Sequence, residues 1–172
     1  MFESFETARL VVRRLTMDDA PELTAISDVA QVSQWMSFME GGFPLEKARA
    51  MIAAQSETGE CFFAVRLRNG TLAGALGMVD HPEGTIEIGY WFGVDYQGNG
   101  YGYEALQAYL EQITADPTLA SRPIIAETRA DNIASKRLLI KAGFAATGQP
   151  GHRPNRIAFA LTPRDSIDAN ST

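Results

Sequence analysis

The chain passes from a strand into a helix through Val94-Asp95-Tyr96-Gln97-Gly98-Asn99-Gly100-Tyr101-Gly102-Tyr103-Glu104-Ala105-Leu106. An apolar run over 86–94 predicts the strand, and an amphipathic run over 101–113 predicts the helix. Glycine leaves its main-chain N–H unshielded and adopts positive φ without strain. The first N–H groups of a helix are unpaired and carry a partial positive charge. We therefore predict that this loop binds a pyrophosphate.

The glycines allow two interpretations of that pyrophosphate. Gly100, Gly102 and Ala105 fit the G-x-G-x-x-A pattern of dinucleotide-binding folds, with Glu127 as the acid that binds the ribose. That pattern belongs to sheets of repeated β-α-β units, whereas antiparallel strands are expected before this loop and no second set of units follows. A nicotinamide or flavin site is therefore the weaker of the two interpretations.

Composition predicts one domain over 1–172 of an ordinary globular protein. The chain has 172 residues, of which 45% are hydrophobic and 21% are charged. Its single cysteine, Cys61, excludes an intramolecular disulfide and a multi-cysteine zinc site, so we expect a reducing, cytoplasmic setting. We expect no signal peptide and no membrane partner, because no apolar run approaches the roughly 20 residues that span a bilayer. The net charge of -6 argues against nucleic acid as a partner.

The hydrophobic pattern predicts an α/β (α+β) fold with the order β-α-α-β-β-β-α-β-α-β-β. Three strands joined by short turns indicate antiparallel pairing, with Asn69-Gly70 as a type I′ turn, and the unit over 86–128 indicates one parallel crossover. We therefore expect a mixed, mostly antiparallel sheet of about seven strands with helices on both faces. Strands are expected over 9–15, 61–68, 71–79, 86–94, 123–128, 144–147 and 157–161, helices near 18–26, 44–52, 101–113 and 132–142, and a frayed tail over 164–172.

Several motifs together resemble the GNAT superfamily of N-acetyltransferases. The run Gln97-Gly98-Asn99-Gly100-Tyr101-Gly102 fits its acyl-CoA loop, Q/R-x-x-G-x-G/A. Some thirty residues on, Asn132-Ile133-Ala134-Ser135 leads into Gly143-Phe144, which resembles the superfamily's N-x-x-S/A motif ending in G-F. The opening over 7–13 and the strand Glu87-Ile88-Gly89-Tyr90-Trp91 resemble its ribosomal-protein-alanine/serine N-acetyltransferase-like branch. The resemblance covers about 7–163, with the motifs in matching order and spacing.

The resemblance implies a GNAT-like fold and an enzyme that uses acetyl-CoA as donor substrate, without a metal. It implies direct transfer of the acetyl group to a primary amine, with a protein or peptide N-terminus as the acceptor that the branch suggests. Relatives also acetylate amino acids, polyamines and antibiotics, so a small-molecule acceptor is the alternative. A noncatalytic acyl-CoA-binding module is a third interpretation, and the chain is expected to be a monomer or homodimer.

The resemblance also assigns cofactor-binding positions. The main chain of Phe92, Gly93 and Val94 would pair with the pantetheine arm, and one N–H there would polarise the thioester carbonyl. Asn132 would hydrogen-bond the cofactor, or serve only as a helix N-cap. Arg137 and Lys136 would bind the 3′-phosphate, or lie on a solvated basic helix face. The pyrophosphate would lie on the main-chain N–H groups of Gln97, Gly98, Asn99, Gly100, Tyr101 and Gly102.

The candidate catalytic residues are Glu87 and Ser135. Glu87 is a carboxylate in an otherwise apolar strand and is suited to take a proton from the attacking amine, although a strand residue on the polar face would look the same. Ser135 or water would donate to the departing thiolate, because Leu139 stands where many family members carry a tyrosine acid. Trp35 and Phe38 would line the acceptor pocket, or simply cover the core edge. His81 and His152 receive no role.

Overall fold

The computed structural model describes residues 2–55 and 58–162, so the polar tail over 164–172 lies outside the described residues. It contains one sheet of eight strands in the order β1-β2-β3-β4-β5-β6-β8-β7. Every neighbouring pair is antiparallel except β5 with β6. The strands are β1 (Ser4–Glu6), β2 (Leu10–Arg14), β3 (Glu60–Leu67), β4 (Leu72–Asp80), β5 (Ile86–Phe92), β6 (Ile124–Arg129), β7 (Phe144–Pro150) and β8 (Arg156–Leu161).

The mixed, mostly antiparallel sheet is confirmed, with one strand more than the sequence predicted. The additional strand is β1, which pairs with β2 at the edge of the sheet. It has three residues and buries only Phe5, so it is too short to show the alternation that marks a strand.

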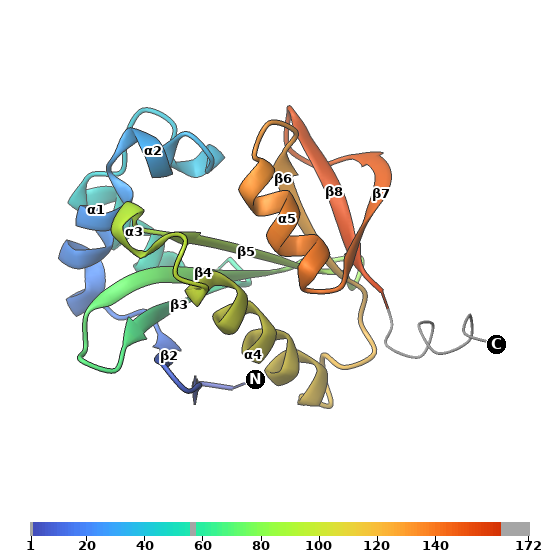
Figure 1. Ribbon diagram of the computed structural model, residues 1–172, viewed down its shortest axis with the longest axis horizontal. Helices are drawn as coiled ribbons and strands as arrows, with labels where there is room; N and C mark the ends of the chain where they lie inside the picture. The colour runs from blue at the N-terminus through green and yellow to red at the C-terminus, as the bar shows by residue number, and fades with distance from the viewer. Residues whose placement is uncertain (1, 56–57, 163–172) are drawn as a thin grey trace.

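Helices cover both faces of the sheet, as predicted (Figure 1). On one face, α1, the short α2 and α3 pack against Phe62, Ala64, Ala75 and Trp91. On the other face, α4 and α5 pack against alternate residues of the same strands, such as Phe63 and Ile88. No helix in the described part of the chain is long and apolar enough to cross a membrane. The helices are α1 (Ala20–Ser27), α2 (Ala30–Ser33), α3 (Leu45–Ala54), α4 (Tyr101–Ala115) and α5 (Ile133–Lys141), with 3₁₀ turns over Met17–Asp19, Ser37–Met39 and Val94–Tyr96.

The hairpin between β3 and β4 forms where it was predicted, but its turn type differs. Of Asn69 and Gly70, only Gly70 has positive φ, at +88°, whereas a type I′ turn needs positive φ at both central residues. The Gly70 N–H donates to the Leu67 carbonyl at 2.8 Å, and the Leu67 N–H donates to the Thr71 carbonyl at 2.9 Å. This is a three-residue loop that ends on a left-handed glycine.

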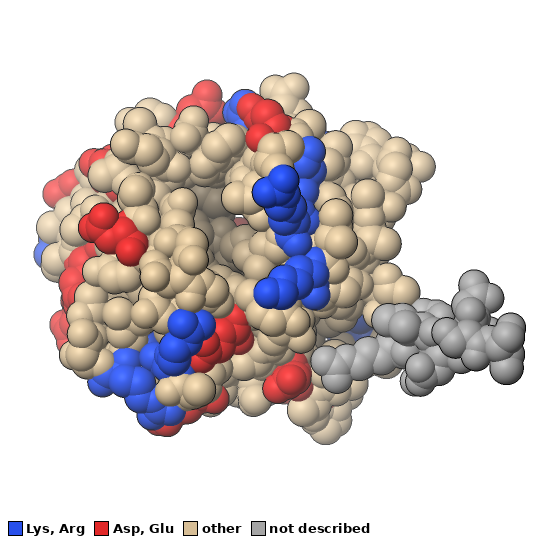
Figure 2. Space-filling model, viewed as in Figure 1, with Lys and Arg blue, Asp and Glu red and all other residues tan. Residues whose placement is uncertain are grey.

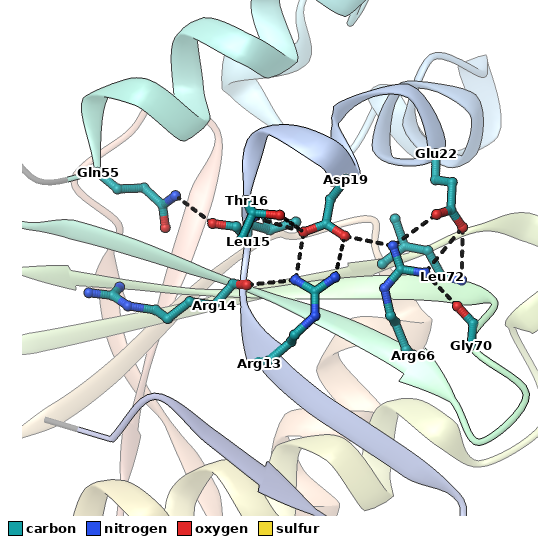
Figure 3. A network of polar contacts seen from close by, with 10 residues as sticks. All are labelled: Arg13, Arg14, Leu15, Thr16, Asp19, Glu22, Gln55, Arg66, Gly70 and Leu72. Atoms are coloured by element: carbon teal, nitrogen blue, oxygen red, sulfur yellow. Dashed lines mark hydrogen bonds and ion pairs between the residues drawn. The ribbon is translucent and has the colours of Figure 1, made fainter.

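A buried ion-pair network fixes the entry of α1 (Figure 3). Asp19 has no exposed surface and accepts from both terminal nitrogens of Arg13 at 2.7 Å and from Arg66 at 2.6 Å. Burial opposes ionisation of this carboxyl, but its hydrogen bonds with Arg13, the Thr16 amide and Arg66 outweigh it and hold its pKa well below the usual range. Asp19 is therefore the acid that holds the start of α1.

The sheet opens between β5 and β6, and this opening positions the site. The two strands pair only from Ile86 to Ile88 against Ile124 to Ala126. Beyond that point β5 continues on β4, while β6 continues on β8. In Figure 1, β6, β8 and β7 with α5 stand apart from the end of the sheet that α1, α2 and α3 cover.

Candidate active site

A cavity of about 470 Å³ lies in the opening between β5 and β6. Figure 2 shows the hollow at the centre of this face, with basic side chains gathered beside it over α5, which carries Lys136, Arg137 and Lys141. The cavity reaches from the glycine loop before α4 to the aromatic residues after α2. Its lining includes the predicted residues Trp35, Phe38, Glu87, Phe92, Gln97, Gly98, Gly100, Gly102, Asn132, Ser135 and Arg137, but not Gly93, Val94, Asn99 or Tyr101.

The glycine loop presents a continuous row of main-chain donors. Gly98 and Gly100 adopt left-handed conformations, with φ of +75° and +79°. Among the described residues, no main-chain hydrogen bond uses the N–H groups from Gly98 to Tyr103. The third glycine has another purpose, because a Cβ on Gly102 would lie 3.2 Å from a methyl group of Leu138 in α5. Two glycines therefore shape the row of donors, and Gly102 permits α4 and α5 to pack closely.

Arg9 and Glu104 brace this loop from the β1–β2 turn. The Arg9 Nε donates to Glu104 at 2.6 Å, its Nη1 donates to the Asn99 carbonyl at 3.0 Å, and its guanidinium lies 4.6 Å from the centre of the Tyr101 ring. Burial opposes ionisation of Glu104, but the Thr7 hydroxyl and Arg9 outweigh it, so the pKa of this carboxyl is lowered. The Asn99 carbonyl and the Tyr101 ring thus help to brace the loop, while the N–H groups of both residues remain in its row of donors.

The end of β5 offers other main-chain groups than the sequence suggested. The Gly93 N–H donates to the Ala73 carbonyl in β4 at 3.0 Å, and the Gly93 carbonyl accepts from the Tyr96 N–H at 2.9 Å, so both main-chain groups of Gly93 already have partners. Alternation along β5 turns the main-chain groups of Tyr90 and Phe92 toward the opening. The Phe92 carbonyl accepts from the Gln97 side chain at 2.9 Å, which leaves the Phe92 N–H facing the cavity. Val94 lies in the 3₁₀ turn beyond the strand and is exposed.

On the α5 side of the opening, Tyr90 approaches Ser135. The Tyr90 hydroxyl lies 2.9 Å from the Ser135 hydroxyl, and burial raises the pKa of Tyr90 to about 12. The Asn132 side chain accepts from the Ser135 N–H at 3.0 Å, so Asn132 is the N-cap of α5. Leu139 is buried in the core. A tyrosine hydroxyl thus lies beside Ser135 after all, but it comes from β5 rather than from α5.

On the opposite face of the sheet, Glu87 is buried and held by two side chains. Its Oε2 lies 3.0 Å from the His81 Nε2, and Arg153 donates to its Oε1. Trp91 lies four residues further along β5 and therefore on the same face, and it belongs to the core under α1 and α3. Glu87 therefore points to the side of the opening that Trp35 and Phe38 enclose.

Glu127 forms the second half of this cluster. Its shielded carboxylate lies 2.7 Å from the His152 Nδ1 and 3.2 Å from the Arg153 Nη1. Burial opposes its ionisation, but the bonds from His152 and Arg153 outweigh it and lower the pKa of Glu127. The Glu127 carboxylate is thus already engaged by His152 and Arg153, so it is not the ribose-binding acid of a dinucleotide site.

The His81 and His152 rings stack with centroids 5.2 Å apart. Ligand atoms of His81, Glu87 and His152 lie within 4.8 Å of one another, a spacing that a metal ion would require. The Arg153 guanidinium touches the same carboxylate, and its positive charge repels a second cation. The arrangement is therefore better described as a hydrogen-bonded cluster, which we name the Glu87–Glu127 cluster, of Glu87, Glu127, His81, His152 and Arg153.

Trp35, Phe38 and Arg156 also line the cavity. The Phe38 ring meets Trp91 edge to face at 5.5 Å and is 37% exposed. The Arg156 Nη2 donates to the Trp35 carbonyl at 2.6 Å, which joins β8 to the segment after α2. Arg137 is exposed at the cavity rim, while Lys136 bonds the Ala130 carbonyl at 2.6 Å and does not line the cavity.

Residues 9–145 match the acetyltransferase (GNAT) domain family. The chain belongs to the GNAT acetyltransferases. It is 31% identical to the uncharacterized N-acetyltransferase YnaD of Bacillus subtilis (strain 168) over 144 residues, which are 83% of this chain and 82% of the relative. The enzyme is an acyltransferase, and acetyl-CoA is its co-substrate.

Solved structures confirm the GNAT fold. A GNAT-family acetyltransferase from Bacillus anthracis superposes with a TM-score of 0.79 at 24% identity, over 92% of this chain and 97% of that one. RimL, a ribosomal L7/L12 alpha-N-protein acetyltransferase in complex with coenzyme A, gives 0.79 at 18% identity, over 92% and 96%. At these identities the likeness concerns the fold alone.

Sequence reasoning about this GNAT site missed the groups that converge from distant segments. Arg153, Arg156 and both histidines stand in no local motif, and Tyr90 received no role within its strand motif. In the sequence, 66 residues separate Glu87 from Arg153. One signal was present, since Arg153 lies in a polar loop that returns to the sheet and Arg156 directly follows that loop. Only the pairing of β6 with β8 shows that this return brings them to Glu127.

Proposed function

We propose that this GNAT enzyme transfers the acetyl group of acetyl-CoA directly to a primary amine. One observation carries the proposal: a single cavity joins a row of free main-chain N–H groups to a buried carboxylate, Glu87. The first feature suits a pyrophosphate, and the second suits an amine that must lose a proton. Direct transfer needs no nucleophilic side chain. Cys61 is buried, burial raises the pKa of its thiol, and it does not line the cavity.

In the proposed complex, the pyrophosphate lies on the N–H groups from Gly98 to Tyr103 at the start of α4. Fifteen residues of α4 add their dipole to this end. The pantetheine arm runs along the open edge of β5, where the Phe92 N–H donates to the thioester oxygen. Arg137 at the rim supplies a positive charge for the 3′-phosphate.

The reaction then requires two proton transfers. The amine nitrogen attacks the thioester carbon, the new C–N bond forms, and the amine proton passes to Glu87 directly or through water. The C–S bond breaks, and the Phe92 N–H stabilises the negative oxygen in between. The departing thiolate accepts a hydrogen bond from Ser135, whose hydroxyl is in contact with Tyr90, and takes its proton from water. A thiol with a pKa near 8.5 leaves with little acid assistance, so this pair contributes less than Glu87 does.

The acceptor that we favour is a protein or peptide N-terminus. RimL, which shares the fold, is an alpha-N-protein acetyltransferase of ribosomal L7/L12. The cavity also opens to solvent beside Trp35 and Phe38, where an extended chain end would enter. A small-molecule amine is the second candidate, because the Glu87–Glu127 cluster and the two aromatic rings enclose a space of small-molecule size.

The test begins with calorimetric titration of acetyl-CoA beside NADH, followed by thiol release on a panel of peptides and small amines. We expect saturable acetyl-CoA binding, no NADH binding, and thiol release with at least one class of primary amine. Binding without turnover on any amine would favour a noncatalytic acyl-CoA-binding module. NADH binding alone would restore the dinucleotide interpretation.

A further inference from the structure

Arg156 is a cation in the acceptor half of the cavity that has no carboxylate partner among the described residues. Its guanidinium donates to two main-chain carbonyls, Trp35 at 2.6 Å and Glu127 at 3.3 Å. The acids nearest to it are already engaged, because Arg153 pairs with the carboxylates of both Glu87 and Glu127. Arg129, on the strand beside it, pairs with Asp131 outside the cavity.

A half-buried guanidinium without an acid is costly, and this cost indicates a missing ligand. Burial and the neighbouring Arg153 both lower the pKa of Arg156, which shows how unfavourable its surroundings are for a positive charge. Of the five N–H groups of an arginine, the two carbonyls use two. The remaining N–H groups can donate to a ligand inside the cavity, which Arg156 lines.

The place of Arg156 distinguishes this ligand from the phosphates of acetyl-CoA. The main-chain donors for the pyrophosphate lie at the start of α4, and Arg137 lies on α5. Arg156 instead reaches the segment after α2, on the face of the sheet to which Glu87 points. The ligand of Arg156 therefore belongs to the acceptor, whose amine would lie at Glu87.

We propose that the acceptor carries an oxyanion, a carboxylate or a phosphate, a few bonds from its amine, and that Arg156 binds this oxyanion. The inference rests on the proposed function and names the chemistry of the acceptor. Arginine is suited to the role because its planar fork matches the two oxygens of either group. The amine and the oxyanion would then orient the acceptor from its two ends.

The test compares matched acceptors that differ only in the anion. The pairs are a dipeptide and its amide, a peptide beginning Ala-Glu and one beginning Ala-Gln, and phosphoethanolamine and ethanolamine. We expect wild type to favour the anionic member of at least one pair by about tenfold or more in kcat/KM, which is about 1.4 kcal/mol. The pair that shows the preference identifies the source of the oxyanion.

Arg156→Gln should remove this preference by lowering kcat/KM on the anionic member while leaving the neutral member within about twofold, and Arg156→Lys should restore part of it. The control is Arg68→Gln, which removes an exposed cation at the β3–β4 turn and should change neither member. Thermal unfolding and acetyl-CoA titration of each variant separate the effect on specificity from an effect on folding.

Equal rates on both members of every pair, or an equal loss on both members in Arg156→Gln, would overturn the inference and leave the proposed function intact. If wild type binds acetyl-CoA but acetylates no primary amine, the proposed function fails and the inference fails with it.

Discussion

Glu87 is a buried acid, and a cation pairs with only one of its two carboxylate oxygens. Arg153 neutralises one carboxylate oxygen, and the other lies 3.0 Å from the His81 ring. His81 is partly exposed, so it offers a route for a proton from the cavity to solvent. In the proposed mechanism, the residue therefore combines a position in the cavity with a path for the proton that it would remove.

Replacement of Glu87 by Gln should lower kcat by about 10² to 10⁴, the usual contribution of a general base, with little change in acetyl-CoA affinity. Arg153 keeps Glu127 as a partner, so we expect the variant to fold. Steady-state thiol release and calorimetry measure the two quantities. Glu83→Gln, in the exposed loop of the same segment, is the matched control. Unchanged turnover in Glu87→Gln would remove Glu87 from the mechanism.

At the scale of elements, the glycine loop and α4 act as one unit. The strand ends, two left-handed glycines reverse the chain, and the first turn of α4 directs its N–H groups into the cavity. Arg9 and Glu104 tie this unit to the edge of the sheet. The loop is thus held open by contacts outside the motif that identifies it.

Gly100→Ala should weaken acetyl-CoA binding at least tenfold. The φ of +79° costs an alanine about 1 kcal/mol, and its Cβ would lie 3.3 Å from the Arg9 guanidinium, so the loop relaxes away from its present shape. The control is Gly148→Ala, which has a similar φ of +73° with nothing within 4 Å. Calorimetric titration compares the two variants. Equal affinity in both would show that the conformation of Gly100 is not needed by the cofactor.

The Asp19 network provides a test of how α1 is attached to β2 and β3. Asp19→Asn leaves Arg13 without an acid, so we expect the free energy of unfolding to fall by about 3 kcal/mol. Urea denaturation at pH 7 measures this change. Asp18→Asn removes a neighbouring exposed acid and should change it by no more than about 0.5 kcal/mol.

The difference in free energy of unfolding between wild type and Asp19→Asn should depend on pH. The pKa of Asp19 is depressed in the folded state, so its contribution is complete above the unfolded pKa near 4 and is lost as the pH falls toward the folded pKa. The difference between wild type and Asp19→Asn should therefore shrink as urea titrations move from pH 6 to pH 3. A constant difference over this range would contradict the assignment.

At the scale of the whole molecule, the site exists because the sheet splits into two halves between β5 and β6. Beyond Ile88, β5 pairs only with β4, and beyond Ala126, β6 pairs only with β8. The two halves of the sheet therefore separate after these residues. Every group that we assign to catalysis lies on one of these halves or on a helix packed against it. A ligand in the opening contacts both halves and should therefore stabilise the entire fold.

Acetyl-CoA should raise the free energy of unfolding by about 2.7 kcal/mol at a concentration of one hundred times its Kd, because it binds only the folded state. NADH at the same concentration should have no effect. Thermal unfolding followed by circular dichroism checks both. Stabilisation by NADH and none by acetyl-CoA would contradict the assignment of the loop.

The elements that the sequence predicted well are those with strong local signals. The amphipathic α4, the apolar β5 and the glycine loop between them depend on neighbours along the chain, and the Asn132 cap depends on a residue three positions away. The turn at Gly70 was placed correctly but typed wrongly, because its geometry depends on how β3 and β4 pair. The oligomeric state, the cytoplasmic location and the acceptor stay predictions.

The sequence alone therefore determined the class of fold and the family and located the glycine loop, since periodicity and short motifs are local properties of the chain. Only the tertiary structure decided the acceptor side. It brought Glu87, Glu127, Arg153 and two histidines into one cluster, placed Tyr90 beside Ser135, and left Arg156 without an acid. These contacts join residues far apart in sequence, and they form only because strands β5, β6 and β8 become neighbours when the sheet folds.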